Sequence, residues 1–248
     1  MNSWGKEDKE GFVSISERGI IKLTPLSYGY TQFGSELHSY LPSEWTAHRT
    51  LVIAGTHGEE ANTTSVLSHA FRSLNPSYLH CAVVLCVNPD GMSHATRGNA
   101  RGVDINRNFP AKNWRQGKVT HKWEEELPQI TELQAGSAPA SESETASLIQ
   151  LIQSNSIKQI ISIHSPLHCV NYEQTEAWPL VDELSKRLAL PIVDDVGYPC
   201  PGSMDAWATE VGLRFVTLEL EHELSMFAIR KKYGPVIQDI LRGAFPGL

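Results

Sequence analysis

Apolar runs and segments with helical spacing alternate along the chain, and this alternation predicts an α/β fold. Short continuous apolar runs are typical of buried strands, and apolar residues three or four positions apart are typical of helices. The predicted strands span 50–54, 81–87, 158–163 and 215–220, and the predicted helices span 60–74, 141–153, 176–190, 204–210 and 225–241. Strands that alternate with helices form a mostly parallel sheet with both faces covered. We therefore expect a three-layer α/β/α fold with a mixed, mostly parallel central sheet, in a single domain over residues 1–248.

Two regions depart from this alternation. Glycines and aromatic residues over 27–34, followed by alternation over 36–41, indicate an antiparallel strand pair at the edge of the sheet. Residues 92–111 form a polar connection rich in arginine, and residues 112–140 show no clear pattern. We expect a long irregular stretch there, and such loops inside a compact domain are usually functional or disordered.

The composition is that of an ordinary globular protein with an acidic balance. The chain has 248 residues, of which 41% are hydrophobic, and its formal net charge is −7. Because no block of basic residues occurs, nucleic acid is not expected as a partner. Residues 1–10 lack the apolar core of a signal peptide, and no apolar run approaches the length of a membrane span. We therefore expect no membrane partner and a cytoplasmic location. The sequence does not determine the oligomeric state, and a homodimer is one of the states it allows.

Three residues at predicted strand ends suggest a metal site. His57 and Glu60 follow the first central strand, and His164 ends the third. In α/β folds ligands bind at the carboxyl ends of the strands. A spacing of three places His57 and Glu60 on one helix face, whereas Glu59 should point elsewhere, into solvent. A catalytic zinc site usually has three protein ligands and one position for water, which favours His57, Glu60 and His164 as ligands.

A candidate general base lies on the fourth predicted strand. Glu219 stands between Leu218 and Leu220, so it should be partly desolvated, and desolvation raises the pKa of a carboxyl group. Such a group can take a proton from water and hand it to a leaving amine. Glu221 is already leaving the strand and is expected at the surface.

Arginines are concentrated in the connection after the second strand. Arg97, Arg101 and Arg107 lie there in an acidic protein, and local arginines beside a metal site favour an anionic substrate. One arginine can stabilise an oxyanion, and another can clamp a carboxylate through two parallel hydrogen bonds. The donor cluster Asn106-Arg107-Asn108 suits that clamp. The competing interpretation is that these arginines only solvate a loop.

Together these segments resemble the zinc carboxypeptidase family of the carboxypeptidase A type. The matching segments, in family order, are His57-Gly-Glu-Glu60, Asn88-Pro-Asp-Gly91, Gly102-Val-Asp-Ile-Asn106-Arg107-Asn108-Phe109, Ser162-Ile-His164-Ser165 and Val216-Thr-Leu-Glu219-Leu220. The resemblance covers about residues 50–220 and implies a single catalytic domain with one zinc ion at His57, Glu60 and His164. It further implies Glu219 as general base and then acid. Arg97 would polarise the scissile carbonyl, and Asn106 and Arg107 would bind the terminal carboxylate.

Other segments are similar to one bacterial branch of that family. They are Ala54-Gly-Thr-His-Gly58, Leu85-Cys-Val-Asn-Pro-Asp-Gly91, Asn108-Phe-Pro-Ala-Lys-Asn-Trp114 and Val196-Gly-Tyr198. The branch hydrolyses the γ-D-glutamyl–diaminopimelate amide bond of the murein tripeptide during cell-wall recycling in the cytoplasm, which implies a small anionic peptide as substrate.

The resemblance also extends to residues that would bind the substrate. Tyr198 resembles the family's mobile substrate-capping tyrosine, and Asp205 lies near its specificity-pocket position. Diaminopimelate carries a second amino and a second carboxyl group, so its pocket should offer an acid and a donor. Asp205 and Arg115 are the candidates for these two roles.

Other functions compete with this one. A zinc-dependent N-acyl amino acid hydrolase shares the histidine–carboxylate turn and an Asn-Arg pair, and a carboxypeptidase of other specificity shares the whole site. The Pro-Asp-Gly turn at 89–91, His164-Ser165 and Thr217-Leu-Glu219 favour the peptidase. A binding module that kept only the fold should lack a ligand or Glu219, and all are present.

Overall fold

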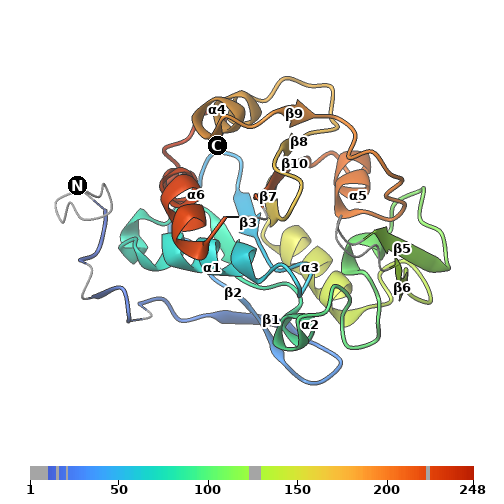
Figure 1. Ribbon diagram of the computed structural model, residues 1–248. Helices are drawn as coiled ribbons and strands as arrows, with labels where there is room; N and C mark the ends of the chain where they lie inside the picture. Colours follow the sequence, from blue (N-terminus) through green and yellow to red (C-terminus); the bar gives the residue numbers. More distant parts are fainter. Residues whose placement is uncertain (1–10, 15–16, 21, 123–129, 222–223) are drawn as a thin grey trace.

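A six-stranded sheet lies at the centre of the structure, a computed structural model that describes residues 11–14, 17–20, 22–122, 130–221 and 224–248 (Figure 1). Its strands are β3 (Thr50–Ile53), β4 (Ala82–Val84), β7 (Gln159–His164), β8 (Val170–Asn171), β9 (Ile192–Val193) and β10 (Arg214–Glu219). The order is β4-β3-β7-β10-β8-β9, with β8 antiparallel to β10 and the other pairs parallel. The predicted mixed, mostly parallel sheet is therefore confirmed. Residues 1–10, on which the expectation about a signal peptide rests, lie outside the described residues.

Helices cover both faces of this sheet, as the alternating pattern requires. They are α1 (Ala61–Arg72), α2 (Pro89–His94), α3 (Ser143–Ser154), α4 (Pro179–Leu188), α5 (Met204–Glu210) and α6 (Met226–Leu241), with 3-10 turns η3 (Pro76–Tyr78) and η4 (Ile105–Arg107). Alternate strand residues enter two hydrophobic clusters. Val52, Ile161 and Val216 pack with α1, α4 and α6, whereas Leu51, Ile160 and Phe215 pack with α3, α5 and η4. The three-layer architecture follows from this alternation.

Two expectations about the edge segments need correction. The predicted antiparallel pair is present as β1 (Leu26–Tyr30) and β2 (Glu36–Ser39), but it forms a separate two-stranded sheet, which a bridge between Tyr40 and Val83 connects to the edge strand β4. The stretch 112–140 is not irregular throughout, because β5 (Lys118–Lys122) and β6 (Ile130–Gln134) pair as an antiparallel hairpin. Its strands are short and polar, so the sequence pattern did not reveal them.

The register of two central strands decides where the polar residues meet. Parallel pairing of β7 with β10 sets His164 directly beside Glu219. Because β3 lies on the other side of β7, the turn after β3 reaches the same edge of the sheet. That edge, at the carboxyl ends of the strands, is where an α/β sheet binds ligands.

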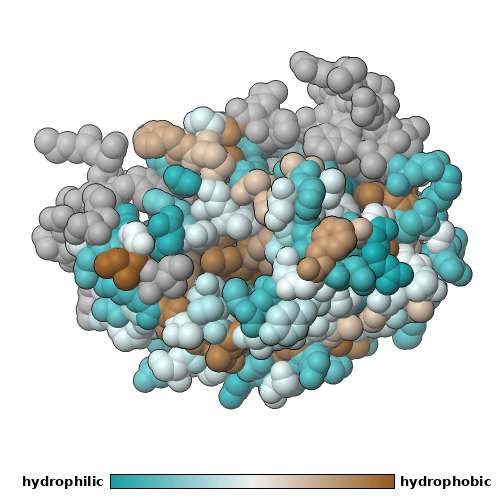
Figure 2. Space-filling model, turned by 90° about the horizontal axis from the view of Figure 1, so that it is seen from below, coloured by the Kyte–Doolittle hydropathy of each residue, from teal (hydrophilic) through white to brown (hydrophobic). Residues whose placement is uncertain are grey.

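Within the described residues, no helix is both long enough and apolar enough to cross a bilayer. On the face drawn in Figure 2, hydrophobic residues form separate patches among hydrophilic ones. Isolated apolar residues of this kind are normal on a protein surface.

Candidate metal centre and active site

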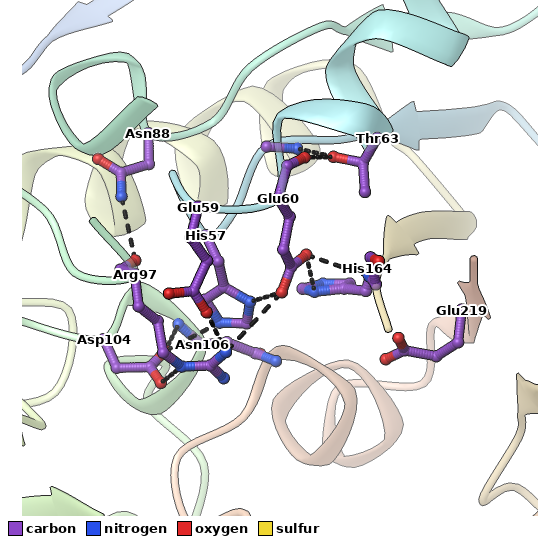
Figure 3. A network of polar contacts seen from close by, with 12 residues as sticks. His57, Glu59, Glu60, Thr63, Asn88, Arg97, Asp104, Asn106, His164 and Glu219 are labelled. Atoms are coloured by element: carbon purple, nitrogen blue, oxygen red, sulfur yellow. Dashed lines mark hydrogen bonds and ion pairs between the residues drawn. The ribbon is translucent and has the colours of Figure 1, made fainter. Parts of the chain in front are cut away.

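Three side chains converge at the carboxyl edge of the sheet (Figure 3). His57 Nδ1 lies 2.6 Å from Glu60 Oε1, and His164 Nδ1 lies 3.1 Å from Glu60 Oε2. One ligand atom from each residue lies within 4.8 Å of the others, and all three residues are buried. Two imidazole nitrogens and a carboxylate are a donor set that catalytic zinc sites use. The three residues therefore fit a zinc ion in type of atom, spacing and burial.

The backbone before α1 brings His57 and Glu60 together. Gly55 has a φ of +63°, which favours glycine, and a Cβ on Gly58 would collide with the backbone of Gly91. The Glu60 N–H donates to the His57 carbonyl oxygen at 3.2 Å, and Glu60 is the N-cap of α1. The expected reason for their proximity was therefore wrong, because a tight turn, and not a shared helix face, places the two side chains together.

Asp104 orients His57 and was missed in the sequence. It is fully buried, and its Oδ1 lies 3.2 Å from His57 Nε2. Its Oδ2 accepts a hydrogen bond from Arg97 Nε at 3.0 Å. An acceptor at Nε2 keeps the proton there and leaves Nδ1 free to bind a metal. The available signal was an acid between two apolar residues, Val103 and Ile105, in a polar connection.

The charges in this network are strongly coupled. Burial raises the pKa of Asp104, but the adjacent Arg97 and His57 outweigh it and hold that pKa well below its usual range. Burial lowers the pKa of His57, and Arg97 adds to this, but Glu60 and Asp104 raise it to about 8. Glu60 keeps a lowered pKa despite burial because both histidines lie beside it. The carboxylates are thus held ionised, as a cation site requires.

Glu59 is not the solvent-exposed residue that its spacing suggested. It forms an ion pair with Arg97, with Nη1 and Oε1 3.3 Å apart, and its side chain is only 10% exposed. Arg97 also lies 3.8 Å from Glu60 Oε1, so three acids surround this one guanidinium. The turn before α1, rather than a helix, aims Glu59 at the arginine. Asn88 fixes the loop that carries Arg97, because its Nδ2 donates to the Gly98 carbonyl oxygen at 3.1 Å.

Glu219 lies next to the candidate metal ligands in a dry environment. It is 7% exposed, and burial raises its pKa, with Glu60 adding to the effect while His164 opposes it. The Leu167 N–H donates to Glu219 Oε2 at 3.2 Å. The expected desolvation is therefore present. Glu221 instead pairs with Lys232 at 3.0 Å and with His168 at 2.8 Å, outside the cleft lining.

Arg107 and Asn106 are arranged for binding a carboxylate. Arg107 is 4% exposed, and within the described part of the chain no carboxylate forms an ion pair with it. Its Nη1 donates to the Asn106 carbonyl oxygen and its Nη2 lies 3.1 Å from Cys200 Sγ. The Met204 N–H donates to Asn106 Oδ1 at 2.9 Å, so the Asn106 amide nitrogen is turned away from α5. A buried arginine without an anion is ready to accept one.

One large cleft contains these residues. Its volume is about 1670 Å³, above the usual range for a small-molecule pocket and sufficient for a peptide. It is lined by all ten residues predicted from the sequence, namely His57, Glu60, Arg97, Asn106, Arg107, Arg115, His164, Tyr198, Asp205 and Glu219.

The more peripheral predicted residues differ in exposure. Tyr198 is 43% exposed, and its pKa is raised by burial and by the Cys200 thiol, while Arg97 and Arg107 oppose the shift. Arg115 is exposed at the rim, and Asp205 is buried in the wall. His168 and Cys169 follow His164 closely in the chain but do not line the cleft.

Comparison with known proteins assigns a family to this geometry. The zinc carboxypeptidase family model matches residues 42–238. The chain therefore belongs to the zinc carboxypeptidase family, and this membership indicates a hydrolase of peptide bonds.

Within that family the chain is similar to one group of bacterial proteins. It is 37% identical over 230 residues to murein peptide amidase A of Escherichia coli strain K12, covering 92% of this chain and 93% of that protein. Murein peptide amidase A of Vibrio campbellii is 36% identical over 228 residues, 89% of this chain and 90% of that protein.

Solved structures agree with this similarity. The crystal structure of murein-tripeptide amidase from E. coli O157 superposes with a TM-score of 0.88 at 35% identity, covering 94% of this chain and 98% of that one. Thrombin-activatable fibrinolysis inhibitor, at 18% identity and a TM-score of 0.67 over 89% of this chain and 70% of that one, supports the fold alone.

Proposed function

We propose that this protein is a zinc-dependent amidase that hydrolyses the γ-D-glutamyl–diaminopimelate bond of the murein tripeptide. The observation that carries the proposal is one cleft that combines a His-Glu-His ligand set, a desolvated carboxyl group and a buried arginine without an anion. The names of the related amidases supply the murein tripeptide as substrate, and the bond that is cut is the one that the sequence resemblance implies.

His57, Glu60 and His164 would hold the zinc ion. Bound zinc supplies Lewis-acid chemistry, because it lowers the pKa of water and polarises a carbonyl oxygen. Asp104 keeps the His57 proton on Nε2, so that Nδ1 is available as a ligand atom.

Glu219 would carry the proton through the reaction. It takes a proton from the attacking water and gives it to the nitrogen of the leaving diaminopimelate as the amide C–N bond breaks. Its raised pKa suits both roles, because a carboxyl group with a pKa nearer to neutral pH can both accept and donate. The products are a γ-glutamyl carboxylate and a free amine, so atoms and protons balance.

Arg107 and Asn106 would grip the carboxylate of the departing residue and set the scissile bond beside Glu219. Arg97 would stabilise negative charge on the scissile carbonyl oxygen. Tyr198 would close over the bound residue. Arg115, at the rim, would offer a positive charge to the acidic peptide.

A direct assay tests the function. Purified protein is incubated with L-Ala-γ-D-Glu-meso-diaminopimelate, and release of diaminopimelate is followed by mass spectrometry, with chelator and with chelator followed by zinc. We expect release, loss on chelation and recovery with zinc. An N-acyl amino acid is the parallel substrate, and turnover of that substrate alone would replace this proposal with the N-acyl hydrolase. The proposal also includes a cytoplasmic location and a role in cell-wall peptide recycling. Cell fractionation would test the location, and analysis of accumulated tripeptide in a deletion strain would test the role.

A further inference from the structure

A short loop joins β7 to β8 across the end of β10, and its backbone contacts two carboxylates of the active site. It covers residues 165–169, and we call it the β7–β8 loop. The Ser165 N–H donates to Glu60 Oε2 at 3.3 Å, and the Leu167 N–H donates to Glu219 Oε2 at 3.2 Å. One loop therefore contacts both a candidate metal ligand and the proton carrier through its backbone donors.

Main-chain hydrogen bonds tie the two ends of this loop to the end of β10. The Leu220 N–H donates to the His164 carbonyl oxygen at 2.8 Å, and the Glu219 N–H donates to the Cys169 carbonyl oxygen at 2.9 Å. These bonds fix the points where the chain leaves β7 and enters β8. Leu167, which donates to the Glu219 side chain, lies between the two fixed points, so its position depends on further contacts.

A side-chain contact holds the middle of the loop. His168 Nε2 lies 2.8 Å from Glu221 Oε1, and Leu167 forms an isolated bridge with Glu221. Because a carboxylate only accepts hydrogen bonds, His168 Nε2 is the donor. His168 has a φ of +53°, in the left-handed region that residues other than glycine seldom adopt. Such a conformation persists where the surroundings hold the residue in place, and Glu221 does this here.

Glu221 is itself fixed from α6. Its Oε2 lies 3.0 Å from Lys232 Nζ and 3.5 Å from the hydroxyl group of Tyr233, which is fully buried. We call His168 and Glu221 the loop clasp. Neither residue lines the cleft, and their side chains are 44% and 23% exposed. Partly exposed ion pairs contribute little to global stability, so removing the clasp should leave the protein folded.

We propose that the loop clasp positions Glu219 for proton transfer, by holding the Leu167 N–H against the Glu219 carboxylate. The N–H occupies Oε2, which fixes the rotation of the carboxylate and leaves Oε1 to meet the proton. A general base must lie within hydrogen-bond reach of the proton that it takes, so this rotation affects the rate. His168 and Glu221 are thus positioning residues, which act through Leu167. This inference rests on the proposed function of Glu219 as proton carrier.

His168→Leu and His168→Gln form the decisive pair of variants. Both keep a side chain of moderate size at the same backbone position. The terminal nitrogen of glutamine stands as many bonds from Cβ as histidine Nε2 and can donate to Glu221, whereas leucine cannot donate. In the murein tripeptide assay, His168→Leu should lose about 10-fold in kcat with little change in KM, the effect of weakening a hydrogen bond to a charged group. His168→Gln should keep most of the wild-type kcat.

A double variant tests whether the clasp acts through Glu219. In the Glu219→Gln protein, adding His168→Leu should lower the residual kcat by less than about twofold, because the carboxylate that the loop orients is gone. Asp239→Asn is the matched control. It breaks an ion pair of similar exposure, with Arg187 at 2.8 Å, and neither residue lines the cleft, so kcat should not change. Thermal unfolding of each variant checks that it is folded.

The outcomes separate this inference from the proposed function. If the wild-type protein does not cleave the tripeptide, the proposed function is wrong. If it does and folded His168→Leu keeps the wild-type kcat, the clasp does not position Glu219. A loss that His168→Gln shares, a loss that persists beside Glu219→Gln, or a loss in KM alone would also overturn the inference. Glu221→Leu removes the acceptor from the other side of the clasp and should reproduce the 10-fold loss in kcat.

Discussion

Replacing Asp104 by asparagine tests whether a residue that cannot reach the metal nevertheless controls metal binding. Asp104 Oδ1 accepts from His57 Nε2 at 3.2 Å and from the Asn106 N–H at 2.9 Å, and Oδ2 accepts from Arg97 Nε at 3.0 Å. All these contacts use acceptor oxygens, whereas asparagine offers one oxygen and one NH₂ group. Either orientation of the amide therefore sets donor against donor.

The magnitude depends on which way the amide points. If its oxygen faces His57, the NH₂ group opposes Arg97 Nε, and His57 keeps its tautomer but loses a charged partner. If its NH₂ group faces His57, the proton moves to Nδ1, the atom that faces Glu60. Loss of such a partner typically costs 10- to 100-fold in metal affinity, which corresponds to about 1.4–2.8 kcal/mol. We expect zinc affinity to fall within this range.

The measurement is zinc affinity of the metal-free protein by competition with a chromophoric chelator, alongside a thermal unfolding curve. Asp90→Asn is the matched control. Asp90 is also a buried acid, but it accepts from Ser35 Oγ at 2.6 Å and from the Phe33 N–H at 3.2 Å, and it does not line the cleft. Unchanged zinc affinity in folded Asp104→Asn would refute the argument. An equal loss in Asp90→Asn would attribute the effect to general destabilisation.

Three further predictions concern Glu219, Arg107 and Asp205. Glu219→Gln should bind zinc normally but lose about 100- to 10,000-fold in kcat, because the proton carrier is gone; near-normal turnover in the mass-spectrometric assay would assign that role to another group. Arg107→Met should raise KM by about 10- to 100-fold for the free carboxylate but little for a substrate amidated there, and steady-state kinetics on both substrates would expose an equal loss. Asp205 binds its proton more tightly in the folded protein, where its pKa is about 8, than in the unfolded chain, so stability should decrease as pH rises from about 4 to 8. In Asp205→Asn that pH dependence should weaken, and urea unfolding at pH 5 and pH 8 would contradict the argument if both proteins responded alike.

The sequence by itself was sufficient for the layers of the fold and for the three residues that form the candidate metal site. Continuous apolar runs at 50–54, 158–163 and 215–220 became β3, β7 and β10, because burial on both faces of a parallel sheet demands such runs. The ligands stood out because each is a polar residue at the end of an apolar run. A pattern of neighbouring residues is enough to predict a strand and its polar end, because both are properties of one short segment.

Only the tertiary structure decided which residues surround the ligands. The ion pairs of Arg97 with Glu59 and Glu60 and the hydrogen bond between His57 and Asp104 join segments far apart in the chain. Such contacts depend on strand register and on the paths of loops, which no local periodicity encodes. Glu59 makes the point most clearly, since spacing directed it into solvent and the turn before α1 directed it to Arg97. The sequence determined which groups could do chemistry, and packing of distant segments determined their charge, their orientation and their neighbours.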